Sequence, residues 1–107
     1  MSDDNKERKL DIPVIIRGTT CYPHFSRYVM TRNLAIVLRD ASGQIHAKAT
    51  VNHPDFPMGN THVLVRDWEE NKDLPALLQK AGIFGELTYP DDCPYSVCQV
   101  LKKPDGF

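Results

Sequence analysis

One stretch of the chain alternates between apolar and polar side chains on both sides of a short turn, and it restricts the fold more than any other feature. Residues 33–52 read NLAIVLRDASGQIHAKATVN, with apolar side chains at every second position of both arms, which is the period of a strand with one buried face. Gly43 can take the positive φ that a tight turn requires. The stretch therefore predicts a β-hairpin. Its core face is expected to hold Leu34, Ile36, Leu38, Ala47, Ala49 and Val51.

The other face of the second strand is polar, and a sheet that is wet on one side is the simplest interpretation. Slipping the pairing by one residue would bury these polar groups, so the pattern also fixes the register. If the chain has a contact surface for a partner, this face is the first candidate, together with a basic residue and the single tryptophan near the end of the strand predicted over residues 61–68. The candidate partner-binding residues are His46, Lys48, Thr50, Asn52, Arg66 and Trp68. Trp68 has a second interpretation as a core residue, because large aromatic side chains are highly buried on average.

The hairpin runs into Asn52-His53-Pro54, where the alternation stops. Pro54 has no N–H for a ladder and holds the preceding residue in an extended conformation, so it ends the strand. A histidine next to prolines is compatible with a catalytic or metal-binding loop, but a structural strand end is the simpler interpretation. On this interpretation Asn52 bonds a neighbouring backbone group and Phe56 packs against the edge of the core.

Five further runs rich in β-branched and aromatic residues predict the other strands. Gly18 ends the first run, and Pro23 removes a ladder donor in the segment after it, so residues 19–25 are interpreted as a loop. The predicted strands cover residues 12–18, 25–30, 61–68, 84–89 and 95–103, with a loop at 90–94.

One segment has the period of a helix. Asp73 is a good N-cap residue, and Pro75 lies in the first turn, where its missing N–H costs nothing. Gly82 is expected at the C′ position and Ile83 as the apolar residue that closes a Schellman motif. The apolar stripe is Leu74, Leu77, Leu78 and Ala81, at i, i+3, i+4 and i+7.

These elements predict an α+β fold: a mostly antiparallel sheet of about five to seven strands, with one main helix packed on one face. The chain has 107 residues, of which 41% are hydrophobic and 25% charged, enough for one core without staples. Residues 1–10 are polar and charged, so we expect a flexible tail before a single domain over residues 11–107.

The charge balance and the cysteine content restrict the partners and the compartment. A formal net charge of −1 argues against nucleic acid as the primary partner. The first residues lack the apolar region of a signal peptide, and no apolar run approaches the ~18 residues of a transmembrane helix. Three cysteines in a chain with its own core require no disulfide, so we expect a cytoplasmic protein with reduced thiols and no membrane partner.

A metal site is the sharpest hypothesis that the cysteines allow. Cys21 and His24 form a C-x-x-H pair, and Cys93 and Cys98 form a second pair with four residues between them. Two such corners brought together would give Cys₃His zinc ligation. Against this, the pairs lack glycine-rich knuckles, and Cys98 falls inside a predicted strand, where a small buried hydrophobe is normal. No cofactor is expected, and a small zinc-binding protein is the alternative.

Catalytic chemistry finds little support. Cys93 stands beside Asp91 and Asp92, and negative charges disfavour the thiolate that a nucleophile needs. Adjacent carboxylates next to a proline are more often solvated turn formers than an acid–base pair. The histidines at 24, 46, 53 and 62 share no tight motif, and no glycine-rich phosphate loop, H-E-x-x-H or G-x-S-x-G is present. A non-enzymatic protein is expected, and a small hydrolytic or ligand-binding enzyme ranks last.

The block from Tyr28 to Leu101 resembles a family of small bacterial proteins of unknown function that are carried largely on plasmids, phages and related mobile elements. The likeness lies in RNLAIVLRD, ATVNHPDFP, VLVRDWEEN, LLQKAGI and CQVL, in this order. The resemblance supplies no catalytic residues and does not extend to CYPHF. It implies an accessory protein that binds and blocks a host protein, including anti-restriction or anti-CRISPR proteins, although fold by itself does not give function.

Overall fold

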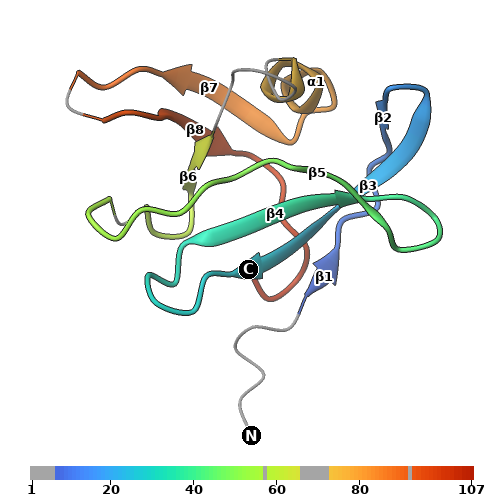
Figure 1. The fold of residues 1–107 in the computed structure, drawn as a ribbon, viewed down its shortest axis with the longest axis horizontal. Helices are drawn as coiled ribbons and strands as arrows, with labels where there is room; N and C mark the ends of the chain where they lie inside the picture. Colours follow the sequence, from blue (N-terminus) through green and yellow to red (C-terminus); the bar gives the residue numbers. More distant parts are fainter. Residues whose placement is uncertain (1–6, 57, 66–72, 92) are drawn as a thin grey trace, which may run out of the picture.

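The computed structural model describes residues 7–56, 58–65, 73–91 and 93–107. The described residues form eight short strands and one helix (Figure 1). In chain order these are β1 (Arg8–Lys9), β2 (Val14–Ile16), β3 (Thr19–Arg27), β4 (Leu34–Arg39), β5 (Ile45–Lys48), β6 (His62–Val65), α1 (Leu74–Lys80), β7 (Phe84–Thr88) and β8 (Ser96–Val100). The predicted α+β class is confirmed. The strands lie in two antiparallel sheets instead of one.

The first sheet is built around β3, the longest strand. β3 pairs with β4, β4 pairs with β5, and the other edge of β3 is shared by β1 and β2. Arg17 and Gly18 connect β2 to β3 with φ values of 50° and 83°, and two successive positive φ values match a type I′ hairpin turn. The prediction of a loop at residues 19–25 was therefore wrong, and Arg17-Gly18 is the turn.

Pro23 is accommodated in the middle of β3 because the edge beside it is interrupted. The carbonyl of Pro23 accepts a hydrogen bond from Leu10 N–H at 2.8 Å, and a paired residue would return a bond from its own N–H. Pro23 has none, and the Leu10 carbonyl instead accepts from Ile12 N–H at 2.8 Å. This local bond satisfies the acceptor and separates β1 from β2, which raises the strand count above the predicted range.

The β4–β5 hairpin forms as predicted, but a bulge changes which side chains point inward. Leu38 pairs with Ala47 and Arg39 pairs with Ile45, which leaves His46 as the extra residue. Ile45 is consequently exposed, and the side chain of His46 is partly buried. The alternation of buried and exposed side chains expected from residue 45 onward is therefore wrong for Ile45 and His46.

The second sheet has the order β6-β8-β7, and within the described ranges one isolated bridge joins it to the first. Val51, three residues beyond the end of β5, pairs with Leu64 of β6 through Val51 N–H to the Leu64 carbonyl at 3.0 Å. Helix α1 contacts β7 and β2, the edge strands of the two sheets (Figure 1). The segment that follows β5 and helix α1 thus each contact both sheets.

A single cluster of buried side chains draws on both sheets and the helix. The predicted core residues of the hairpin and of the helix belong to it, with Leu77 and Ala81 partly buried at its margin, while Val51 is half-buried outside it. The fully buried side chains of highest volume include Phe25, Leu34, Ile36, Leu38, Leu78, Ile83 and Phe84. This confirms the faces assigned to residues 34–38, 47–49 and 74–81.

The C-terminal end of α1 matches its prediction residue by residue. Ile83 N–H bonds the Leu78 carbonyl, and Gly82 N–H bonds the Gln79 carbonyl, both at 3.0 Å, which is the Schellman pattern. Gly82 has a φ of 80°, and Ile83 is fully buried. At the N-terminal end, Asp73 occupies the predicted N-cap position, but its side chain makes no capping hydrogen bond.

The N-terminal residues that are described do not lie free. Arg8 pairs with Phe25 and Lys9 with His24 in β1, and Glu7 contacts β4 through Arg39. The ordered fold thus begins before residue 11, where the boundary of the domain was expected.

Candidate functional site

The proposed zinc ligands are separated by the fold. Because residues 19–27 form a strand, Cys21 and His24 point to opposite faces of it: Cys21 is fully buried in the core, and His24 bonds Glu7 on the outer face, Nδ1 to Oε1 at 3.0 Å. Cys98 is buried in β8, and Cys93 is half-buried in the loop before it. Within the described ranges, no group of three or more His, Cys, Asp or Glu side chains is placed to hold a metal ion.

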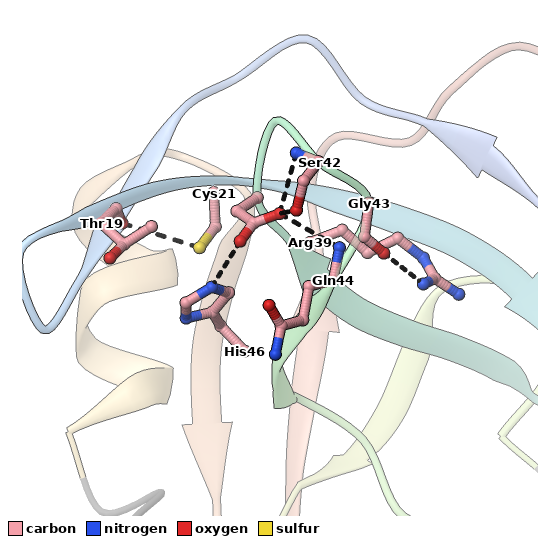
Figure 2. A network of polar contacts seen from close by, with 8 residues as sticks. Thr19, Cys21, Arg39, Ser42, Gly43, Gln44 and His46 are labelled. Carbon is pink, nitrogen blue, oxygen red and sulfur yellow. Dashed lines mark hydrogen bonds and ion pairs between the residues drawn. The ribbon is translucent and has the colours of Figure 1, made fainter.

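The turn between β4 and β5 is organised by the carboxylate of Asp40, whose partners Ser42, Gln44 and His46 are labelled in Figure 2. One oxygen accepts bonds from Ser42 N–H at 2.9 Å, Ser42 Oγ at 2.6 Å and Gln44 N–H at 3.0 Å. The other lies 2.7 Å from Nε2 of His46. The hydrogen bonds from Ser42, followed by that from His46, hold the pKa of Asp40 well below its ordinary value of 3.8. This is the structural role of an Asx turn.

Cys21, Asp40 and His46 supply the residue types of a nucleophilic triad, but their arrangement does not suit one. The Cys21 thiol is fully buried and lies 3.6 Å from the Thr19 carbonyl (Figure 2). Burial, with the charge of Asp40 as a second cause, raises the pKa of this thiol, whereas a reactive cysteine needs exposure and a lowered pKa. The carboxylate and the imidazole stabilise the turn.

A second polar cluster lies on the outer face of the first sheet. Arg39 binds Glu7 through two bonds, Nε to Oε1 at 2.7 Å and Nη2 to Oε2 at 3.0 Å, and donates Nη1 to the Gly43 carbonyl at 2.7 Å. The hydrogen bond from Arg39 is the largest cause that lowers the pKa of Glu7, and burial lowers the pKa of His24. The cluster ties the N-terminal segment to β4 and to the β4–β5 turn.

The polar strand face expected over residues 46–52 does not exist as one surface. His46 turns to Asp40 because of the bulge, and Lys48 is exposed on β5. Thr50 is buried, with 5% of its surface exposed, because its hydroxyl accepts Ile36 N–H at 3.1 Å and lies 3.0 Å from the Tyr28 hydroxyl. Asn52 is exposed. Arg66 and Trp68, the other two candidates, lie outside the described residues.

Asn33 is a buried polar residue that joins two loops. Its Nδ2 donates to the Phe56 carbonyl at 3.2 Å, and its Oδ1 accepts Met58 N–H at 2.9 Å. Asn52 Oδ1 accepts from Thr31 Oγ1 at 2.6 Å and lies 3.4 Å from Asn33 Nδ2. Asn52 therefore bonds side chains instead of the neighbouring backbone that was expected, and the loop after it is held against the β3–β4 connection.

Phe56 occupies a more exposed place than predicted. Its ring centroid lies 5.0 Å from the ring of His53, and the residue is half-buried outside the main core cluster. The His53 ring also lies 6.3 Å from that of Tyr95, and His53 Nδ1 accepts Asp55 N–H at 3.2 Å. These contacts fit the structural interpretation of the His53-Pro54 segment.

The β3–β4 turn, residues 28–33, exposes two apolar side chains at its tip. Val29 is 68% exposed and Met30 89% exposed. The turn is closed by Tyr28 N–H to the Asn33 carbonyl and by Arg32 N–H to the Tyr28 carbonyl, both at 2.9 Å. Glycine, proline, asparagine, aspartate and serine dominate such turns, so two large apolar residues at the tip are unusual.

A hollow of about 430 Å³ lies beside this turn. We refer to it as the turn hollow, and its lining residues are Arg27, Thr31, Arg32, Asn33, Gly59 and Asn60. Sequence reasoning missed it because the β-propensity of Tyr28 and Val29 made residues 25–30 look like a strand. The available signal was Arg32-Asn33 directly before a strongly alternating strand, since asparagine is a common turn residue.

No family model, curated protein or solved structure matches the chain in comparisons with known proteins. Over the part of the chain that the structure describes, no helix is long and apolar enough to cross a membrane. The residues of the described clusters and turns are therefore the remaining indication of function. Their polar clusters hold turns and loops in place, and the β3–β4 turn presents apolar surface.

Proposed function

We propose that this chain is a non-enzymatic protein-binding module and that the β3–β4 turn is the centre of its contact surface. The observation that carries the proposal is the exposure of Val29 and Met30 on a turn whose conformation is fixed on both sides. Full burial of side chains of this size contributes about 1.5–3 kcal/mol each. Such exposed groups become anchors when a partner covers them.

The hydrogen bonds around the turn lower the entropy that binding would otherwise cost. Arg27 Nη1 donates to the Arg32 carbonyl at 3.0 Å, and the Tyr28 hydroxyl lies within 3.2 Å of the Thr50 carbonyl. Asn33 adds bonds to the loop that follows β5. A recognition loop that is already held in one conformation loses less freedom on binding, and this raises affinity without any added contact.

The internal satisfaction of the polar groups supports a non-enzymatic role. Among the described residues, every buried side-chain nitrogen or oxygen has a hydrogen-bond partner. The best candidate triad has its thiol buried, with the carboxylate engaged in a turn. These groups therefore serve the fold. Among the exposed large apolar side chains of the described residues, Met30 and Val29 have the highest exposed fractions, ahead of Tyr89 at 67%.

The biological setting in this proposal rests on the sequence resemblance to small proteins of plasmids and phages. We place the chain among accessory or anti-defence proteins that bind and block a protein of the host cell, with restriction or CRISPR nucleases as the first partners to test. Small single-domain proteins of mobile elements often act in this way.

Affinity capture with a matched pair of variants tests the contact surface. The double variant Val29→Ser/Met30→Ser removes the apolar tip, and Ile15→Ser removes an apolar side chain that is 63% exposed on β2. Capture from host lysate, followed by mass spectrometry, should lose a specific partner with the double variant and retain it with Ile15→Ser. Retention with the double variant, at an unchanged unfolding midpoint, would refute the proposed surface.

Plating efficiency tests the setting separately. A phage that is restricted by a host nuclease should plate more efficiently on cells that express the chain than on cells that express Val29→Ser/Met30→Ser. If the phage plates equally well on both kinds of cells, in hosts with a restriction nuclease and in hosts with a CRISPR nuclease, the anti-defence role is refuted and the protein-binding function is unaffected.

A further inference from the structure

Basic side chains line the turn hollow. Arg27 and Arg32 belong to its lining, and none of the lining residues that the structure describes is acidic. Lys103, in the C-terminal segment, contacts the lining residue Asn60, because its Nζ donates to the Asn60 carbonyl at 2.6 Å. The hollow therefore favours an anionic group, and it adjoins the exposed apolar tip of the β3–β4 turn.

Arg27 is the best-positioned of these cations. It is half-buried at the end of β3, its guanidinium lies 5.3 Å from the ring centroid of Phe107, and its Nη1 donates to the Arg32 carbonyl. Its Nε and Nη2 donate to no group in the described part of the chain. A guanidinium that is fixed by stacking and one bond retains a planar pair of donors, which is the geometry that a carboxylate accepts.

We propose that the turn hollow binds a carboxylate of an acidic peptide segment, and that an apolar residue next to this carboxylate packs on Val29 and Met30. The inference rests on the protein-binding function proposed above and gives the partner its chemistry. Arg27 would hold the carboxylate through its free N–H groups, Lys103 would add charge, and the apolar tip would supply the desolvated contact beside it.

An acidic peptide suits this surface better than a nucleic acid. A nucleic-acid surface needs a tract of Lys and Arg that neutralises several phosphates, and this chain carries 13 basic against 14 acidic residues. The exposed apolar side chains directly beside the hollow would face phosphate and water on a nucleic acid. On an acidic peptide they would meet an aliphatic neighbour.

Two blocked tetrapeptides test the proposal by NMR titration of the ¹⁵N-labelled full chain. Acetyl-Leu-Asp-Glu-Leu-amide should shift the backbone amides of Arg27, Thr31, Arg32, Gly59 and Asn60 at up to about 10 mM peptide. Acetyl-Leu-Asn-Gln-Leu-amide, which has the same shape without charge, should bind at least about fivefold more weakly. Arg27→Gln and Lys103→Gln should each lower the affinity for the acidic peptide. The control variant Lys80→Gln, at the exposed end of α1, should leave this affinity unchanged.

The outcomes separate this inference from the proposed function. Equal shifts from the two peptides, or none from the acidic one, would overturn carboxylate recognition. A thymidine oligonucleotide that shifts the same amides at lower concentration would assign the hollow to phosphate and overturn it as well. Either result, combined with partner capture that still depends on Val29 and Met30, removes only the inference. Loss of that dependence removes the proposed function.

Discussion

At the scale of single residues, several polar side chains of this protein hold loops and turns in place through hydrogen bonds to the backbone. Asn33 is 3% exposed and bonds two backbone groups of the loop that follows β5. Asp40 does the same for the β4–β5 turn. Removing Asn33 leaves part-buried donors and acceptors unpaired, which costs more than the bond itself contributes.

Asn33→Ala should lower the free energy of unfolding by about 1–3 kcal/mol, because the Phe56 carbonyl and Met58 N–H lose their partner. His53→Ala, in the loop that contains Phe56 and Met58, should be close to neutral, since its ring packs against half-buried neighbours and its hydrogen bond with Asp55 N–H is exposed to solvent. Urea denaturation of both variants gives the comparison. A larger loss for His53→Ala would assign that histidine a role which its contacts do not explain.

Acid should weaken the β4–β5 turn through Asp40. The folded pKa of Asp40 lies below its ordinary value of 3.8, so the unfolded chain takes up the proton first. The contribution of this carboxylate is therefore complete above pH 3.8 and is lost as pH falls further.

The variant Asp40→Asn tests the sign of this dependence. Its destabilisation relative to the native sequence should be constant at neutral pH and should shrink below pH 3.8, where the native carboxylate also becomes protonated. Thermal unfolding from pH 7 to pH 2.5 measures it. A difference that grows on acidification would contradict the assigned role.

At the scale of elements, the sequence predicted those features that depend on interactions between residues close together in the chain. The Schellman end of α1 depends on Gly82 and on the apolar residue that follows it, and both are readable in the sequence. The interruption beside Pro23 depends on Leu10 and Ile12 from another segment, and no local rule exposes it. The bulge at His46 leaves the alternation of apolar and polar residues in the sequence unchanged. The outward orientation of Ile45 could therefore not be predicted from the sequence either.

The end of α1 gives a direct test of an element. Gly82→Ala should lower the free energy of unfolding by about 1 kcal/mol, because a φ of 80° places the added Cβ in an unfavourable conformation. Gly82→Asn should lower it less, since asparagine tolerates this region better. Equal losses in the two variants, measured by chemical denaturation, would point to a packing conflict instead of backbone strain.

At the scale of the whole molecule, one core holds two sheets and a helix together. Ile36 and Leu78 are fully buried, whereas Leu77 lies at the margin of the cluster. The sequence pattern placed all three on the core side but could not rank them, because their depth depends on how the two sheets meet. The candidate site was less accessible to sequence reasoning, because it combines residues 27–33 with residues 59–60 and Lys103.

Ranking the core positions tests the packing. Ile36→Ala and Leu78→Ala should each lower the free energy of unfolding by about 2–5 kcal/mol, the range for deleting a fully buried aliphatic side chain. Leu77→Ala should lower the free energy of unfolding by less than Leu78→Ala does. If the order of the two leucine variants is reversed in denaturation experiments, the face of α1 that packs on the sheets has been assigned wrongly.

Removal of metal tests the alternative function, in which the protein binds zinc and its whole fold depends on the metal. Cys21 and His24 lie on opposite faces of β3, and burial raises the pKa of Cys98 to about 11, which disfavours the thiolate that zinc requires. Protein purified without added metal should keep its unfolding temperature after treatment with a chelator. Stoichiometric zinc that is lost together with the fold would instead favour the zinc-binding protein.

Site-specific photo-crosslinking tests the central claim most directly, because it reports on contact in the intact complex. A photoreactive residue is placed at position 30, on the apolar tip of the β3–β4 turn, or at position 15 on β2, both of which are exposed. Irradiation in host cells should yield one discrete crosslinked partner from position 30 and none from position 15. The same partner from position 15, with none from position 30, would contradict a contact surface centred on the turn.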